Sequence, residues 1–190
     1  MNTLIILTAK YLYIIIILIG IVVFLGADKQ DKMRLVKLVL VAGPLALIMV
    51  FISSHLFYDA RPFVVQNIQP LIPHSPDNGF PSDHTLVSML VAFSIYQIQK
   101  RAGVLLVLLA VIVGVSRVLV HIHYPVDILG STVIAMIAVG GALFVLKKVS
   151  PGQDDKLYTQ KATLATCLCL IRAFLLFIHF LLQFSRSPFL

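Results

Sequence analysis

The stretch from Leu4 to Leu25, LIILTAKYLYIIIILIGIVVFL, contains a single charged residue, Lys10. A run of about 20 apolar residues is what an α-helix needs to cross the hydrocarbon core of a bilayer. The run is too long for a cleaved secretory signal, and no cleavage site of small residues precedes Gly26-Ala27. We therefore expect it to form an uncleaved first transmembrane helix.

The composition of the whole chain agrees with this. Of its 190 residues, 59% are hydrophobic and 12% are charged, against about 25% charged in ordinary soluble domains. A soluble protein of this size could not hide so many apolar side chains from water. The formal net charge is +7, but the basic residues lie between the hydrophobic runs, which is typical of membrane topology signals rather than of nucleic-acid binding. The sequence predicts an all-α, polytopic integral membrane protein.

Six hydrophobic runs predict about six transmembrane helices in a bundle, which we interpret as one domain over residues 1–190. Pro44 in the second run is expected to kink its helix. The third run is short and is expected to begin in a wet cavity. The sixth is the weakest candidate because it contains Arg172 and His179, and its cysteines, Cys167 and Cys169, are expected to serve packing. The runs are Leu4–Leu25, Leu35–Phe57, Thr85–Ile98, Gly103–Val120, Val126–Leu146 and Ala162–Phe184.

The basic residues divide the connections into two groups. One group holds ten lysines and arginines, and the other holds only Arg61, Arg117 and Arg186. Cytoplasmic loops carry the excess of Lys and Arg, so the second group is predicted to face outward. The outward group includes the proline-rich loop Tyr58–Ser82, expected to be extended and stiff, and the turn near His123. The first group consists of Lys29, Lys32, Arg34, Lys37, Lys100, Arg101, Lys147, Lys148, Lys156 and Lys161.

Three short polar motifs lie in this outward group. In Pro81-Ser82-Asp83-His84, Ser82 or Asp83 is a natural N-cap, and the free N–H groups of a helix N-terminus attract anions. Taken alone the motif is a capped helix, although a cap does not require His84. Arg61-Pro62 and Ser116-Arg117 each offer a guanidinium, which suits bidentate phosphate binding. The alternative for each arginine is a side chain that snorkels to the interface.

The third motif, His123-Tyr124-Pro125-Val126-Asp127, leads into the fifth hydrophobic run. Pro125 suits the first position of a helix, and Asp127 lies in its first turn. His123 and Asp127 are four residues apart and can meet across that turn. A carboxylate that accepts the Nδ1 proton leaves Nε2 free as a base or nucleophile. The alternative is an interfacial histidine beside an ordinary acidic first turn, but all such alternatives must hold together to dismiss a shared site.

No metal or other cofactor is expected. Asp59, Asp77 and Asp83 could suggest a Mg²⁺ site, but prolines separate them and the arginines already supply positive charge. His55, His74 and His121 are expected to have interface or hydrogen-bonding roles, and His121 is the best spare candidate for contacting a second phosphate.

In this order and spacing, with His123 and Asp127 at +7 and +11 from Ser116, the motifs resemble the type 2 phosphatidic acid phosphatase superfamily over about residues 54–131. Asp59 to Asp127 is most similar to bacterial undecaprenyl-diphosphate phosphatases of the bacitracin-resistance type. The cues are Asp83 within Pro-Ser-Asp-His-Thr, the segment Ile72-Pro73-His74, and the His123 motif. The wider family has a lysine where this chain has Ser54; the bacitracin-resistance type also tends to lack it.

The resemblance implies dephosphorylation of undecaprenyl diphosphate to undecaprenyl phosphate at the outer face of a bacterial plasma membrane, which supports wall synthesis and bacitracin resistance. His123 would form a phosphohistidine, Asp127 would orient it, and His84 would act as acid and then base. Phosphate contacts fall to Arg61, Arg117 and Ser82, with Ser116 and Asp83 in lesser roles.

Two other functions stay open. One is phosphatase action on phosphatidylglycerol phosphate or phosphatidic acid. The other, from a different class, is a non-catalytic lipid binder or flippase on the same scaffold. The partners expected are the polyprenyl diphosphate substrate and the bilayer, with no nucleic acid; the sequence does not predict an oligomeric state.

Overall fold

The computed structural model describes residues 2–149. The predicted sixth helix, with Arg172, His179 and both cysteines, lies outside the described residues. Contacts divide the chain into one unit over Met1–Leu146 and a second over Lys147–Leu190, and the fold below is that of the first. The single domain over 1–190 stays a prediction.

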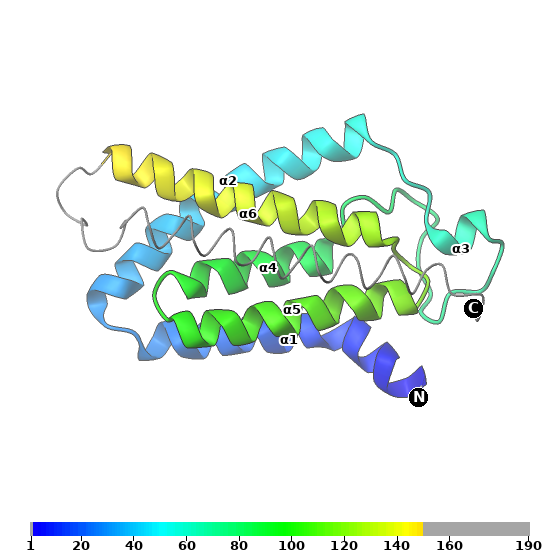
Figure 1. Ribbon diagram of the computed structural model, residues 1–190, viewed down its shortest axis with the longest axis horizontal. Coiled ribbons are helices and arrows are strands. Elements are labelled where there is room, and N and C mark those ends of the chain that lie inside the picture. Colours follow the sequence, from blue (N-terminus) through cyan, green and yellow to red (C-terminus); the bar gives the residue numbers. More distant parts are fainter. Residues whose placement is uncertain (1, 150–190) are drawn as a thin grey trace. The chain divides into compact units, whose positions relative to one another are not determined.

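Within residues 2–149 the regular structure is helical (Figure 1). Four of these helices, α1 from Thr3 onward, α2, α5 and α6, are long and apolar enough to cross a membrane. The predicted all-α, polytopic membrane fold is therefore confirmed. The elements are α1 (Asn2–Gly26), α2 (Lys29–Leu56), α3 (Pro62–Val65), α4 (Asp83–Tyr96), α5 (Lys100–Leu119) and α6 (Pro125–Val149).

The hydrophobic runs locate the helices well, except at the start of α2. This helix begins at Lys29, whereas the apolar run begins at Leu35. The reason is an N-cap that precedes the basic residues: the Asp28 carboxylate accepts a hydrogen bond of 2.8 Å from the Asp31 amide. The first turns of α2 are thus helical although they carry charges, and Pro44 lies inside the helix.

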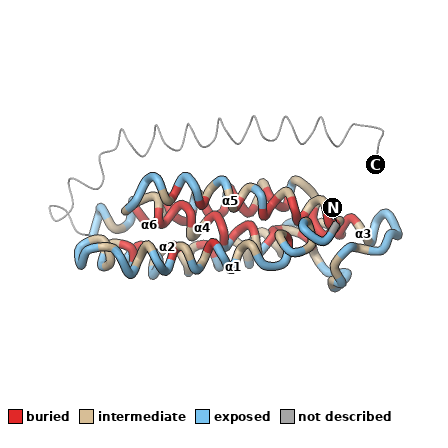
Figure 2. The backbone as a smooth tube through the Cα atoms, turned by 90° about the horizontal axis from the view of Figure 1, so that it is seen from below, coloured by how far each residue is buried: buried red, intermediate tan, exposed pale blue. Residues whose placement is uncertain are grey.

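Helix α4 has 14 residues, which span only about 21 Å and are too few to cross the hydrocarbon alone. It contacts α1, α2 and α5, and most of its side chains are buried. Figure 2 shows this as the red interior of the tube between paler outer helices. Protein rather than lipid therefore surrounds most of α4, and its first turn holds His84 at one end of the bundle.

The two ends of this bundle differ in character. The α2–α4 connection and the α5–α6 turn lie at one end, on the right in Figure 1, and the α1–α2 and α4–α5 connections lie at the other. The first end carries all three polar motifs. The second carries the basic residues near Lys29 and Lys100. The distribution of Lys and Arg along the sequence predicted that the polar motifs and these basic residues lie at opposite ends.

The loop between α2 and α4 is folded rather than extended, which corrects the expectation for residues 58–82. Pro62 begins the one-turn helix α3, because its fixed φ suits a first helical position. Ala60 and Asn78 pair as an isolated antiparallel bridge. The Asn78 amide also donates to the carbonyls of Ser54, at 3.0 Å, and Phe57, at 3.1 Å. These contacts fasten the loop to the end of α2.

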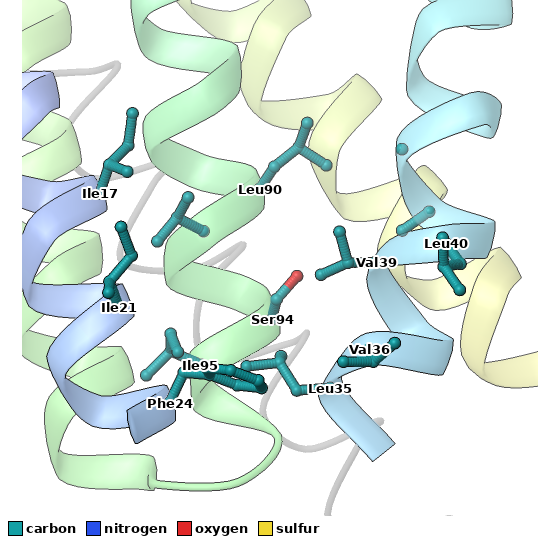
Figure 3. Close-up of a pocket in the computed structure, with 14 residues that line it drawn as sticks. Ile17, Ile21, Phe24, Leu35, Val36, Val39, Leu40, Leu90, Ser94 and Ile95 are labelled. Atoms are coloured by element: carbon teal, nitrogen blue, oxygen red, sulfur yellow. The ribbon is translucent and has the colours of Figure 1, made fainter. Parts of the chain in front are cut away.

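An apolar cavity of about 390 Å³ lies between α1, α2 and α4 (Figure 3). Ile17, Ile21, Val39 and Leu90 help to line it, and the one polar side chain among its lining residues is Ser94. On α4 its lining runs from Leu90 to Ile95, away from the first turn that bears His84. The cavity is therefore separate from the polar end.

Candidate active site

The turn between α5 and α6 determines where His123 points. Helix α5 ends at Leu119, and His121, just after its C-cap Val120, adopts the left-handed region at φ 61°. The His121 amide donates to the Val118 carbonyl at 2.9 Å, and the Ile122 amide donates to the Arg117 carbonyl at 3.3 Å. This pair of bonds is a Schellman motif. It reverses the chain within a few residues and presents His123 just before α6 begins at Pro125.

His123 and Asp127 meet across the first turn of α6. The His123 Nδ1 atom lies 3.2 Å from Asp127 Oδ2, and the Tyr124 amide donates to the same oxygen at 2.9 Å. The side chains are only 3% and 0% exposed, respectively. The four-residue spacing thus gives a buried histidine–carboxylate pair.

Two guanidinium groups face the other ring nitrogen of His123. Arg61 Nη1 and Arg117 Nη2 each lie 3.4 Å from His123 Nε2, at the long end of hydrogen-bond range. A guanidinium has only donors and an ionised carboxylate has only acceptors. With Asp127 ionised, His123 therefore carries its proton on Nδ1, and Nε2 presents a lone pair toward two cations.

This environment keeps the imidazole neutral. Burial, followed by the charges of Arg117 and Arg61, lowers the pKa of His123 to about 3. Nε2 is consequently unprotonated throughout the neutral range. A neutral nucleophile beside two positive charges is suited to attack an anionic phosphorus centre, since the arginines offset the charge of the phosphate.

Arg61 is fixed from several sides. Its Nε donates to Asp77 Oδ1 at 2.7 Å, its Nη1 to the Ile122 carbonyl at 3.2 Å and its Nη2 to the Asn78 carbonyl at 3.3 Å. Burial of Asp77 opposes its ionisation, but the hydrogen bond and charge of Arg61 outweigh it, and the pKa of Asp77 is lowered. Arg61 is 6% exposed, so it does not snorkel to the interface.

Arg117 is buried in the same way, at 4% exposed. Its Nη2 also lies 3.4 Å from His74 Nε2, and its Nε, buried, has no hydrogen-bond partner among residues 2–149. Burial, together with the charges of Arg61 and Arg117, lowers the pKa of His74. A neutral His74 can accept from Arg117 and so help to aim it at His123.

His84 lies in the first turn of α4 and is half-buried. Its ring makes an edge-on contact with Tyr13 of α1, with ring centroids 4.4 Å apart. Burial, followed by the charge of Arg117, lowers the pKa of His84 to about 4. The structure thus brings both predicted catalytic histidines, Asp127 and both arginines to one end of the bundle.

The other residues predicted to bind substrate are Ser82, Ser116 and Asp83. Ser82 is the fully buried N-cap residue of α4, and its hydroxyl lies 3.2 Å from Thr85 Oγ1 rather than capping a backbone amide. The Ser116 hydroxyl donates to the Val113 carbonyl of its own helix at 2.7 Å. Asp83 is exposed. Their roles in substrate binding stay predictions.

Sequence reasoning missed several residues of the site. Tyr13 packs on His84 from a helix 70 residues away, and no local pattern marks it. Asp59 interacts with Asp127: burial, followed by the charge of Asp127, raises the pKa of Asp59. Asn78 accepts from the amides of Asp59 and Phe80, each at 3.0 Å. The Asn78-Gly79 pair before Phe80-Pro81 is a turn signal, and it could have identified Asn78 as a residue that binds the loop backbone.

The three aspartates considered as a metal site have separate surroundings. Asp59 interacts electrostatically with Asp127, Asp77 accepts a hydrogen bond from Arg61, and Asp83 is exposed. Across residues 2–149, no group of three or more His, Cys, Asp or Glu side chains is arranged to hold a metal ion.

Comparison with known proteins agrees with this geometry. The family model described as PAP2 superfamily matches residues 34–150. Undecaprenyl-diphosphatase BcrC of Bacillus subtilis (strain 168) is 30% identical over 137 residues, which cover 72% of this chain and 70% of the relative. The bacitracin transport permease protein BcrC of Bacillus licheniformis is 32% identical over 146 residues, covering 76% and 70%.

Solved structures share the fold. LpxE of Aquifex aeolicus superposes with a TM-score of 0.61 at 22% identity, covering 75% of this chain and 85% of that one. A PAP2 type phosphatidylglycerolphosphate phosphatase from Bacillus subtilis gives a TM-score of 0.55 at 20% identity, covering 80% and 79%.

Proposed function

The chain belongs to the PAP2 superfamily, and from that membership we propose that it is a lipid phosphatase that converts undecaprenyl diphosphate to undecaprenyl phosphate. One observation carries the proposal: His123 Nε2 faces both Arg61 and Arg117 at 3.4 Å while Nδ1 faces a buried carboxylate at 3.2 Å. This is a nucleophile held among anion-binding groups. The named activity of the BcrC relative supports the choice of lipid.

In the first step, His123 Nε2 attacks the terminal phosphorus. A nitrogen–phosphorus bond forms, the bond to the bridging oxygen breaks, and the bridging oxygen leaves on undecaprenyl phosphate with a proton from His84. The negative charge of the bound diphosphate raises the pKa of His84 and so supplies the protonated form that this step needs. Arg61 and Arg117 stabilise the equatorial oxygens of the transferring group. Asp127 stabilises the positive charge that develops on the His123 ring through the Nδ1 proton.

In the second step, water cleaves the phosphohistidine. His84, now neutral, takes a proton from the water as its oxygen attacks phosphorus, and the nitrogen–phosphorus bond breaks. Orthophosphate leaves, and both histidines return to their starting forms. A positioned acid or base of this kind contributes about 10²–10⁴-fold in rate.

The reaction is assigned to the outer face of the plasma membrane. Support comes from the ten basic residues of the opposite connections, because cytoplasmic loops carry the excess of Lys and Arg. The apolar cavity between α1, α2 and α4 supports a lipid substrate, since an isoprenoid tail matches walls that are apolar except for Ser94. Leu90 lies about 9 Å along α4 from His84, so a tail can reach the cavity from a head group at the site.

The test is phosphate release from undecaprenyl diphosphate by the purified chain in detergent, with EDTA present. We expect release by the parent and none above background by His123→Ala, because no other described group combines the lone pair of Nε2 with two guanidinium neighbours. The expected loss exceeds about 100-fold. A chemical quench of the parent with labelled substrate should trap an acid-labile phosphohistidine.

The same assay separates the alternatives. Release only from phosphatidylglycerol phosphate or phosphatidic acid would keep the mechanism and replace the substrate. Head-group binding that survives His123→Ala, with no hydrolysis of any of these lipids by the parent, would favour a non-catalytic lipid binder or flippase.

A further inference from the structure

Within residues 2–149, only one of the two carboxylate oxygens of Asp127 takes part in hydrogen bonds. Oδ2 receives hydrogen bonds from His123 Nδ1 and from the Tyr124 amide. Oδ1 is buried and has no hydrogen-bond partner among residues 2–149. Burying a carboxylate oxygen without a hydrogen-bond donor costs free energy. A donor to Oδ1 would therefore stabilise the folded state.

Another carboxyl group lies close enough to interact with this carboxylate. It belongs to Asp59, in the loop after α2, and the two acids act on each other electrostatically. Two carboxyl groups can share a hydrogen bond only when one of them carries a proton. Oδ2 already has two donors, which leaves Oδ1 as the natural acceptor.

The loop holds Asp59 in place through its backbone rather than its side chain. The Asp59 amide donates to Asn78 Oδ1 at 3.0 Å, and its carbonyl accepts from the Gly79 amide at 2.8 Å. Gly79 is packed closely beside both acids, because a Cβ atom there would lie 3.2 Å from Asp127 Oδ2 and from the Asp59 carbonyl. The loop thus holds the backbone of Asp59 beside Asp127.

We propose that Asp59 is a positioning residue: it keeps a proton and donates it as a hydrogen bond to Asp127 Oδ1, so that the carboxylate facing His123 is held from both sides. The inference rests on the proposed function, since it assigns Asp59 a part in orienting the nucleophile. Asp59 would not touch the substrate; it would act through Asp127.

The surrounding charges explain why the proton belongs on Asp59. Burial, followed by the charge of Asp127, raises the pKa of Asp59. Burial opposes the ionisation of Asp127, whereas the Tyr124 amide, the Asp59 carboxyl and the charge of Arg61 favour its ionised form. Burial, followed by Asp59 and Asp127, also raises the pKa of Tyr124, which stays neutral. When pH rises through the pKa of Asp59, the hydrogen bond is replaced by repulsion between two carboxylates, and the orientation of His123 is disturbed.

The experiment compares Asp59→Asn and Asp59→Ala with the parent, measuring kcat on undecaprenyl diphosphate from about pH 5 to about pH 9. The asparagine amide can donate to Asp127 at every pH. We therefore expect the ratio of kcat for Asp59→Asn to kcat for the parent to rise with pH, by up to roughly tenfold. Asp59→Ala should lose about tenfold at the acidic end, where the parent holds its proton. Asp28→Asn, which preserves the N-cap of α2 far from the site, is the matched control and should keep the parent profile.

A second readout does not depend on activity. A carboxyl whose pKa is raised in the folded state contributes stability at low pH that is lost as pH rises through the folded pKa. The thermal midpoint of Asp59→Asn relative to the parent should therefore increase with pH, and that of Asp28→Asn should not.

The outcomes separate this inference from the proposed function. A parent without phosphate release would refute the proposed function, while the thermal measurement would still decide whether Asp59 shares a proton. A normal parent with an inactive His123→Ala variant, and an Asp59→Asn ratio that does not change with pH, would overturn the role of Asp59 alone. Asn and Ala variants that behave identically would also overturn it.

Discussion

The polar end of the bundle and the apolar cavity in its other half depend on different kinds of contact. At the polar end, single atoms from distant parts of the chain meet: Arg61 reaches the Ile122 carbonyl at 3.2 Å, and Arg117 reaches His74 at 3.4 Å. Around the cavity, side chains of α1, α2 and α4 supply apolar surface except for Ser94 and leave about 390 Å³ unfilled. The polar end depends on the direction of a few hydrogen bonds, whereas the cavity depends on volume and apolarity.

A methyl group added at each region should expose this difference. Gly79→Ala places a Cβ atom 3.2 Å from Asp127 Oδ2, 3.2 Å from the Asp59 carbonyl and 3.5 Å from Arg61 Cγ. These neighbours must shift by a few tenths of an ångström, and misplacement of catalytic groups on the ångström scale can cost about 100-fold. We expect kcat to fall by roughly 10- to 100-fold, measured as phosphate release from undecaprenyl diphosphate.

Gly43→Ala is the matched control for that variant. Gly43 lines the cavity, and apart from its chain neighbours a Cβ atom there meets nothing within 4 Å. Its kcat should stay within about twofold of the parent. The conflict between an alanine Cβ and the ring of the following Pro44 offsets the better helix propensity of alanine, so no gain in stability is expected. Equal losses of activity in the two variants would show that the site does not depend on the geometry around Asp127.

The same difference explains what could be predicted from the sequence. Helices follow from apolar runs, so α1, α5 and α6 end within a few residues of their predicted bounds, and only the capped start of α2 was placed wrongly. The His123–Asp127 contact follows from a four-residue spacing on one helical turn. Asp59 and Tyr13 could not be predicted, because their contacts depend on how a loop folds back and where α1 packs. Their significance appears only when residues far apart in sequence are seen together.

A smaller effect, on stability, is expected where α5 and α6 pack closely next to Asp127. A Cβ atom at Gly114 would lie 2.5 Å from Ile128 Cγ2, in the residue next to Asp127. Overpacking of this kind costs about 1–3 kcal/mol, and the helix propensity of alanine offsets part of it. Gly114→Ala should lower the thermal midpoint, with a net loss of roughly 1–2 kcal/mol.

Gly140→Ala on α6 is its control, since a Cβ atom there meets nothing within 4 Å. That variant should be as stable as the parent or more stable by about 0.5–1 kcal/mol. If Gly114→Ala were equally benign, the close approach of α5 and α6 would not contribute to holding the first turn of α6.

The smallest effect is expected at His121, where the site and the fold can be told apart. This residue adopts φ 61° at the C-terminus of α5, a conformation that glycine adopts without the steric cost borne by a residue with a Cβ atom. His121→Gly keeps the backbone bonds of the Schellman motif and should stabilise the protein by roughly 0.5–1 kcal/mol, with kcat unchanged within about twofold. Asn67→Gly, at the other left-handed residue (φ 51°), is the matched comparison for thermal unfolding. A selective loss of diphosphate hydrolysis in His121→Gly alone would instead assign the His121 ring to the second phosphate. The polar end would then use this turn for substrate contact as well as for the chain reversal that presents His123.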